Sequence, residues 1–351
     1  MLLYFLVAIS PLVISYFFPK LNIDNKTKKR YLIVCGIVLV LFIGLRNKYL
    51  GSEDSLNYYN HMRQALLTSS WSSYYNDTGF ETGFQFFVFS LSRIFTSPQM
   101  LFVVTSIIYI SSISYCIYKN SDNIVMSLVI YITLGMMQFQ MQGMRQAIAM
   151  SICLFAFEVA KQKKLIPFIL LILLASLFHR TAIVFFVCYL VVYLPYNLGV
   201  VSIFSVGALL LFANSKYITQ IANTIFESEY TRTLDSGGFV ATAIYVIILV
   251  MAMLIHRKAL YKKENKTQTT IFYVTFIAFI NYVMRYFGVG ISERISFYFM
   301  FGQTLLLPNT ITNISKDYKK ATTIGVYVMC ILLFLYRLHG SEFVPYQFFW
   351  Q

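Results

Sequence analysis

Apolar runs long enough, or nearly long enough, to cross a lipid bilayer recur along the whole 351-residue chain. A membrane-spanning α-helix needs about 20 such residues, with a range of about 17 to 25. The candidate runs lie near residues 1–18, 31–45, 98–118, 124–140, 147–160, 164–178, 181–194, 198–213, 239–256, 270–287, 295–308 and 322–338. The sequence therefore predicts an all-α polytopic membrane protein with about 12 transmembrane helices, in a range of about 10 to 13.

The composition agrees with this prediction and argues against a nucleic-acid-binding function. Hydrophobic residues make up 58% of the chain and charged residues 12%, whereas soluble domains carry about 25% charged residues. The net charge of +14 comes from Lys and Arg residues that lie between apolar runs. Such a distribution is typical of membrane proteins, whose cytoplasmic loops are basic. We expect membrane lipid as a partner and no nucleic acid.

The distribution of basic residues also predicts an orientation. With the amino terminus outside, the inner loops collect more than half of the 28 Lys and Arg residues. These are Lys20, Lys26, Lys28, Lys29, Arg30, Lys119, Lys161, Lys163, Lys164, Arg257, Lys258, Lys262, Lys263, Lys266, Lys316, Lys319 and Lys320. The outer side then has two sizeable loops, 46–83 and 214–238. Segment 84–95 is expected to be re-entrant or interfacial, because a full crossing would turn the later basic clusters outward. The chain is expected to form one transmembrane domain, 1–351.

Five arginines lie at outer ends of the expected spans, against the orientation bias. They are Arg46, Arg145, Arg180, Arg285 and Arg294. An arginine at such a boundary needs water or an anionic partner, and each one alone is explained by snorkelling or by an ion pair. Together they favour a shared anion site, because the planar guanidinium group matches phosphate oxygens with two parallel hydrogen bonds.

Other outer residues could supply proton transfer and sugar contacts. His179 lies in a hinge between two apolar runs and could act as a base, or could be structural. The nearest outer carboxylates include Asp54 and Glu81, either of which is a competing base. Tyr58 and Tyr59 could contact sugars, shape the loop around Asp54, or belong to the aromatic belt of the membrane interface.

Five stretches resemble, in order, motifs of the EpsG-like, Wzy-type polysaccharide polymerases. They are GLRNKYLGSEDSLNYY at 44–59, FETGF at 80–84, GMRQAIAMSI at 143–152, FHRTAI at 178–183 and ERISFYF at 293–299. The chain departs from the family pattern twice. Glu53 is an extra residue before Asp54, and Thr82 stands where the family has proline after the glutamate.

The resemblance implies a bacterial enzyme of the cytoplasmic (inner) membrane with its active site facing the periplasm or the cell exterior. Such a polymerase joins undecaprenyl-pyrophosphate-linked oligosaccharides into a surface polysaccharide, for example O-antigen or exopolysaccharide. A GT-C-like architecture and a metal-independent glycosyltransferase reaction without a cofactor are expected. The partners would be the lipid-linked donor and acceptor glycans, with a chain-length regulator as a further candidate.

The expected site combines the family motifs with the charge argument. Substrate and pyrophosphate binding is expected from Arg46, Arg145, Arg180, Arg285, Arg294, Tyr58 and Tyr59. Catalytic roles are expected from His179 as the base and from Asp54 and Glu81. Two alternative functions remain open at this stage, an O-antigen ligase and a lipid-linked oligosaccharide flippase or other transporter. A transporter would be expected to carry ionisable residues near the bilayer midplane and paired repeats of spans, and the sequence shows neither clearly.

Overall fold

The computed structural model describes the chain except residues 20, 22–23, 52, 76–78, 227–236 and 256–265. Within this described part the regular secondary structure is helical, apart from one isolated β-bridge between Arg46 and Phe348. The first helices are α1 (Leu2–Tyr16), α2 (Asn25–Gly44), α3 (Glu53–Leu67), α4 (Trp71–Tyr74), α5 (Thr82–Ile94), α6 (Gln99–Asn120), α7 (Ile124–Thr133), α8 (Met136–Gln142), α9 (Met144–Lys161) and α10 (Leu165–Ser176). The remaining ones are η1 (Arg180–Phe185), α11 (Phe186–Val191), α12 (Leu198–Ala213), α13 (Ser215–Phe226), α14 (Gly237–Ile255), α16 (Lys266–Met284), η2 (Arg285–Phe287), α17 (Ile291–Phe299), α18 (Phe301–Thr312) and α19 (Lys316–Leu338).

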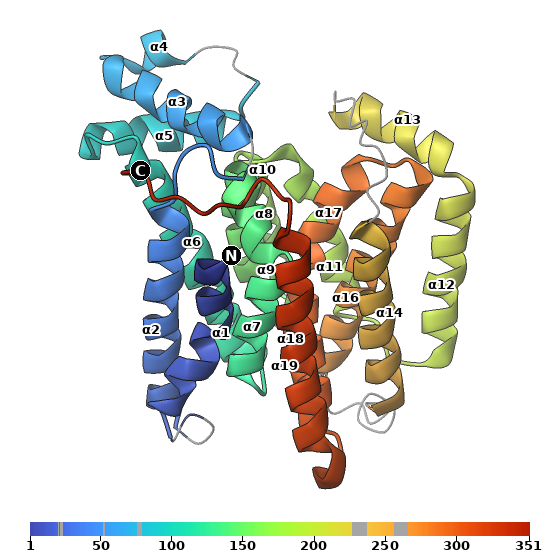
Figure 1. The fold of residues 1–351 in the computed structure, drawn as a ribbon. Coiled ribbons are helices and arrows are strands. Elements are labelled where there is room, and N and C mark those ends of the chain that lie inside the picture. The colour runs from blue at the N-terminus through green and yellow to red at the C-terminus, as the bar shows by residue number, and fades with distance from the viewer. Residues whose placement is uncertain (20, 22–23, 52, 76–78, 227–236, 256–265) are drawn as a thin grey trace.

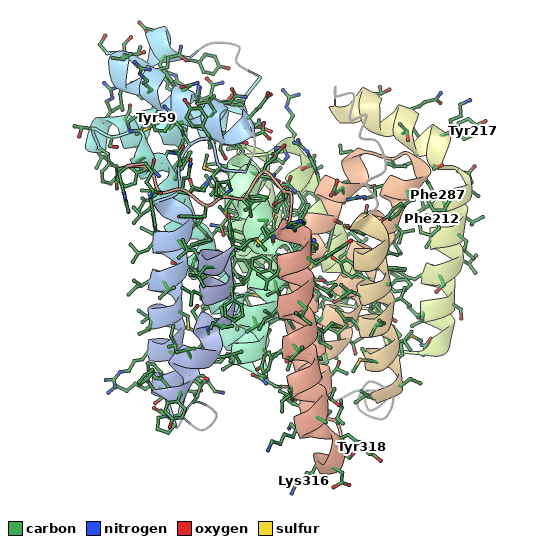
Figure 2. The ribbon with its side chains drawn as sticks, viewed as in Figure 1. Tyr59, Phe212, Tyr217, Phe287, Lys316 and Tyr318 are labelled. Carbon is green, nitrogen blue, oxygen red and sulfur yellow. The ribbon has the colours of Figure 1, made fainter. Side chains whose placement is uncertain are left out.

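The long helices stand side by side, and several shorter ones lie across one end of them (Figure 1). We call the end that carries α3, α4, α5 and α13 the loop-rich end; it is the upper end in Figure 1. Lys316, which begins α19, lies at the opposite end (Figure 2). The closest helix neighbours are α2 with α6, α9 with α6 and α10, and α16 with α17.

The predicted all-helical fold is confirmed, and each expected span coincides with a helix or with consecutive helices. Among the described residues, three helices are long and apolar enough to cross a membrane alone: Gln99–Asn120, Lys266–Phe287 and Lys316–Leu338. Two bent pairs, α7 with α8 at 50° and α12 with α13 at 79°, raise this number to at most 5. The count of about 12 spans and the GT-C-like architecture stay predictions.

Two segments expected to be outer loops contain helices. In the first, Glu53 and Asp54 lie in the opening turn of α3, where acidic side chains favour a helix. Tyr58, Met62 and Ala65 follow at helical spacing and bury one face of α3. The second expected loop, 214–238, contains α13, and its residues 227–236 lie outside the described part. Short amphipathic helices, which lack a long apolar run, were therefore missed.

Some of the predicted features cannot be placed. Ser52 of the first family motif lies outside the described residues, as does Lys20. The same holds for residues 257–265 of the expected inner basic cluster. Lys161 ends α9, about 24 Å along the helix axis from Arg145 in its first turn. Lys161 and Arg145 thus lie at opposite ends of this helix.

The Gly-Leu-Arg motif closes the loop-rich end of α2. A Cβ atom at Gly44 would lie 2.9 Å from the Cα atom of Val103, so only glycine permits this approach of α2 to α6. The Gln99 side-chain amide donates to the carbonyl oxygens of Gly44 at 2.7 Å and Arg46 at 3.0 Å. Arg46 is 1% exposed and donates to the carbonyl oxygen of Met141 at 2.6 Å. The motif therefore joins α2, α6 and α8.

The carboxyl-terminal segment after α19 packs over the same region. The backbone N–H of Phe349 donates to the carbonyl oxygen of Leu45, and that of Asn47 to Gln347, each at 2.9 Å. The hydroxyl group of Tyr4 in α1 donates to the carbonyl oxygen of Phe343 at 2.7 Å. The carboxyl-terminal segment thereby contacts both α1 and the residues that follow α2.

We expect Gly44→Ala to lower the melting temperature of the detergent-purified protein. The added methyl group would press on the backbone of α6, and overpacking of this kind typically costs about 1–3 kcal/mol. Gly207→Ala in α12 is the matched control, because a Cβ atom there meets nothing within 4 Å. Equal melting temperatures for the two variants would contradict the close approach of α2 to α6.

Candidate active site

A cavity of about 220 Å³ lies where α3, α8, α9, the turn before η1, α17 and the end of α19 meet. Its polar lining consists of Asp54, Tyr58, Gln138, Gln142, Arg145, Gln146, His179, Glu293, Arg294, Arg337 and Ser341. The helix break between α7 and α8 borders it at Gly135. Irregular backbone at membrane depth is tolerated where it lines such a cavity, because water or ligand can reach its polar groups.

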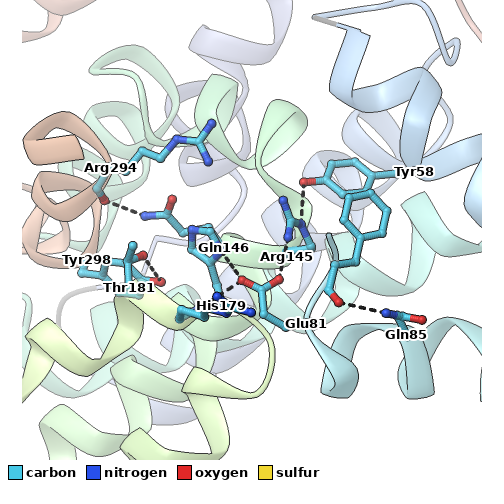
Figure 3. Close-up of polar contacts among 11 residues, drawn as sticks. Tyr58, Glu81, Gln85, Arg145, Gln146, His179, Thr181, Arg294 and Tyr298 are labelled. Atoms are coloured by element: carbon cyan, nitrogen blue, oxygen red, sulfur yellow. Dashed lines mark hydrogen bonds and ion pairs between the residues drawn. The ribbon is translucent and has the colours of Figure 1, made fainter. Parts of the chain in front are cut away.

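One carboxylate, that of Glu81, holds two of the lining side chains (Figure 3). Its Oε2 atom accepts a hydrogen bond from Arg145 Nη1 at 2.6 Å, which is also an ion pair. Its Oε1 atom contacts His179 Nδ1 at 3.0 Å and accepts from the backbone N–H of Arg180 at 3.1 Å. Glu81 thereby connects α5, α9 and the turn between α10 and η1.

The start of α5 is shaped to bring Glu81 to this place. The backbone N–H of Gly83 donates to the carbonyl oxygen of Leu177 at 3.0 Å, and a Cβ atom at Gly83 would lie 2.6 Å from that oxygen. Glu81 precedes the helix in extended conformation and its side chain does not cap it. Thr82 is the first helical residue, a position that favours proline because its N–H would have no helical partner. Thr82 therefore stands at a position that would also accept proline.

Electrostatics fix the protonation states of Glu81 and His179. Burial raises the pKa of Glu81, but the hydrogen bond with His179 and the charge of Arg145 outweigh it and lower the pKa to about 2. Burial lowers the pKa of His179, and Arg145 and Arg294 lower it further, although Glu81 opposes them. At neutral pH Glu81 is ionised and His179 is uncharged.

The tautomer of His179 follows from these states. An ionised carboxylate can only accept, so Nδ1 of His179 carries the proton and donates to Glu81. The other ring nitrogen, Nε2, is then a bare acceptor. It has no hydrogen-bond partner among the described residues, and His179 lines the cavity. The site therefore contains a buried, oriented and unprotonated ring nitrogen beside the cavity.

Arg145 is engaged on several sides. Burial lowers the pKa of its guanidinium group, but Tyr58 and Glu81 reverse this and raise the pKa above its usual value. Its Nε atom donates to the hydroxyl oxygen of Tyr58 at 3.4 Å, and its guanidinium carbon lies 4.4 Å from the ring centroid of Phe80. Arg145 thus holds Glu81 and Tyr58 at the edge of the cavity.

The other predicted arginines are divided between the cavity and other surroundings. Arg294 lines the cavity, and its backbone carbonyl oxygen accepts from Gln146 Nε2 at 2.6 Å (Figure 3). Arg285 does not line it and forms an ion pair with Glu293 at 2.6 Å. Arg180 is exposed and lines a separate surface groove behind Glu81. Of the five predicted arginines, Arg145 and Arg294 line the cavity.

Two further predicted residues lie away from the cavity. Arg46 is buried beneath the carboxyl-terminal segment, and its guanidinium carbon lies 4.2 Å from the ring centroid of Phe102. The ring of Tyr59 packs edge-on against Phe102 and lies beneath the ammonium group of Lys48. The predicted residues that do line the cavity are Asp54, Tyr58, Arg145, His179 and Arg294.

Sequence reasoning missed Arg337, in the last turn of α19. Its side chain is exposed in the cavity and lies against Gly135, whose φ of +102° favours glycine. A Cβ atom at Gly135 would lie 3.3 Å from Arg337 Nη2. Arg337 meets the criterion that singled out the other outer arginines, because it stands at the outer end of an expected span. In the described part of the chain, no group of three His, Cys, Asp or Glu side chains could hold a metal ion.

The family assignment rests on comparison with known proteins. The model of the EpsG family matches residues 29–348, a range that includes every lining residue of the cavity. No curated protein and no solved structure matches the chain. The family model covers most of the chain and all five motif stretches, which confirms the resemblance seen in the sequence. The protein belongs to the EpsG family.

Proposed function

We propose that this protein is a polysaccharide polymerase that joins undecaprenyl-pyrophosphate-linked repeat units in the cavity at the loop-rich end. Membership of the EpsG family supports a polymerase-like role in polysaccharide synthesis. The observation that carries the proposal is the bare Nε2 atom of His179, whose ring is oriented by Glu81. A carboxylate that fixes the tautomer of a histidine is a recurrent way to present a general base.

The proposed reaction moves the growing glycan from its lipid carrier to the next repeat unit. The acceptor hydroxyl group attacks the anomeric carbon of the donor and forms the new glycosidic bond. The bond between that carbon and the pyrophosphate oxygen breaks, and its electron pair leaves with the pyrophosphate. The hydroxyl proton passes to Nε2 of His179, and Glu81 stabilises the imidazolium ion that forms.

Arginines in the cavity are suited to the leaving group. Negative charge grows on the pyrophosphate as the bond breaks, and cationic groups placed there in advance stabilise the transition state. Arg294 and Arg337 line the cavity from α17 and α19, on elements far apart in the sequence. We assign these two side chains to the pyrophosphate, and we assign Arg145 and Arg46 to positioning and support.

The acceptor side of the cavity is rich in neutral polar groups. Gln138, Gln142 and Gln146 line it together with Asp54 and Tyr58. Amide, hydroxyl and carboxylate groups suit the hydroxyl groups of a sugar, which both donate and accept hydrogen bonds. In the proposed orientation the loop-rich end faces the outside of the cytoplasmic membrane, since the expected inner loops are basic.

Deletion of the gene in its host, followed by electrophoresis of the surface glycan, tests the function. A polymerase predicts a product capped with a single repeat unit, because ligation and export continue. Complete loss of the repeat-bearing product would instead indicate a ligase or a flippase. Purified protein should extend a lipid-linked repeat unit in vitro, which neither alternative would do.

We expect His179→Gln to lower the rate of chain extension by about 100-fold to 10,000-fold, the usual cost of losing a general base. Asp54→Asn should cost less, because Asp54 is exposed and contacts the acceptor side. The rates would be measured with purified protein and a lipid-linked repeat unit. The reverse order would make Asp54 the base and His179 an orienting residue.

The acid limb of the pH profile of kcat/KM should report the protonation of His179. Because its pKa is lowered, the neutral base persists at pH 6.5, the usual histidine pKa, and kcat/KM should fall only at more acidic pH. Glu81 raises the pKa of His179, so Glu81→Gln should move the acid limb to lower pH. The same substitution should also lower the plateau value of kcat/KM. Titration of the substrate itself affects the wild type and the Glu81→Gln variant equally, so it does not contribute to the difference between them. A limb that stays in place, or moves to higher pH, would contradict the pairing.

We expect Arg294→Lys and Arg337→Lys to lose most chain extension although each keeps its charge. A bidentate contact with phosphate depends on guanidinium geometry, which an ammonium group cannot reproduce. Lys316→Ala at the opposite end of α19 is the control and should extend normally. Glycan ladders like those of the wild type, at normal protein levels, would remove both arginines from the pyrophosphate site.

A further inference from the structure

The polar cavity continues toward the apolar part of the bundle. Next to it lies a small cavity of about 50 Å³, which shares Gly135, Glu293, Phe297 and Arg337 with the polar cavity. Beyond that lies a groove of about 260 Å³, which shares Ile244 with the small cavity. The three spaces therefore follow one another from the loop-rich end into the bundle.

The groove is apolar and open between two helices. Its lining residues come from α14, α18 and α19, and they are Ile244, Ile247, Ile248, Met251, Leu307, Thr322, Gly325, Val326 and Met329. Helix α14 packs mainly on α16 and α18, whereas α19 packs on α7, α1 and α18, so α18 forms the floor between them. Only 22% of the most apolar stretch of α19 is buried, compared with 56% and 61% in the other two long apolar helices.

The direction of the groove matches a lipid inserted from the loop-rich side. Arg337 lies at the polar cavity, and Thr322 lies at the far part of the groove. Fifteen residues of α-helix separate them, which corresponds to about 22 Å along the axis of α19. A headgroup at Arg337 would thus have its tail directed into the apolar layer.

We propose that this groove binds the polyisoprenoid tail of the lipid-linked substrate, with the pyrophosphate at Arg337. The inference rests on the proposed function and specifies which part of the substrate each space receives. The continuity of an apolar groove with a cationic cavity fits a molecule that is a long hydrocarbon with an anionic head. An ordinary phospholipid also has an apolar tail, and photolabelling with competing lipids distinguishes the two.

The junction offers polar groups where the tail meets the pyrophosphate. Tyr245 and Gln303 line the small cavity, and each is 1% exposed. The hydroxyl oxygen of Tyr245 and the amide nitrogen of Gln303 have no hydrogen-bond partner among the described residues. Both groups can donate, and a phosphate oxygen at the head of the tail would satisfy them.

Gly325 provides a way to fill the groove without disturbing the fold. A Cβ atom at this position meets nothing within 4 Å, and the same is true of Gly207 in α12, which lines none of the cavities described here. The Gly325→Phe variant should therefore fold, and its new side chain should project into the groove. Gly207→Phe is a matched control, since it adds the same side chain to an open position of another apolar helix.

Kinetics with two donors test the proposal. We expect Gly325→Phe to raise KM for the undecaprenyl-linked donor by about tenfold, with kcat little changed, because tail contacts are lost. A farnesyl-linked donor, whose short tail ends above Gly325, should show the same KM in Gly325→Phe and wild type. Gly207→Phe should match wild type with both donors. Equal KM values for Gly325→Phe and Gly207→Phe would overturn the groove assignment.

Photolabelling separates failure of this inference from failure of the proposed function. An undecaprenyl pyrophosphate probe with a photoreactive tail should label peptides of α14 and α19 in the wild-type protein. Excess undecaprenyl pyrophosphate should suppress the label, and phosphatidylglycerol should not. Equal suppression by phosphatidylglycerol would mean that the groove holds bulk lipid. Specific labelling without chain extension would support the groove and refute the polymerase.

Discussion

The ion pair and hydrogen bonds of Glu81 are the interaction on which the site depends. A largely buried carboxylate is stable only when its charge is compensated, and here Arg145, the ring of His179 and the backbone of Arg180 provide that compensation. Removal of Arg145 would leave the charge of Glu81 without its ion-pair partner. The cost of such an uncompensated charge exceeds the stabilisation that the ion pair provides. The position of each of the three segments that carry Glu81, Arg145 and His179 therefore depends on the other two.

The arginines show why sequence alone could identify a boundary but not a site. All of them stand at outer ends of expected spans, yet only a position on the correct side of its helix reaches the cavity. His179 stands in extended conformation just before η1, and Arg180 is the first residue of η1. His179 lines the cavity, whereas Arg180 lines the groove behind Glu81. Arg46 is turned inward and supports the backbone instead.

The fold was predictable where hydrophobicity alone determines it. Within a bilayer, a long apolar run can form all of its backbone hydrogen bonds internally only as a helix. Each expected run is helical in the structure. Helices α3 and α13 were missed because their stability comes from one buried face, which a search for long apolar runs ignores. The contact of Gly83 with Leu177, which brings Glu81 to His179, lies between segments about ninety positions apart, and no local pattern reveals it.

The surroundings of His179 connect substrate binding with proton transfer in the proposed reaction. Arg145 and Arg294 lower the pKa of His179, so the empty site keeps its base neutral. A pyrophosphate bound at Arg294 would cancel part of this positive charge, and the pKa of His179 would then rise. The base therefore becomes stronger when the donor is in place, and the proton that it takes up is stabilised by the same anion that must leave. Arg294 would in this way serve both the leaving group and the base.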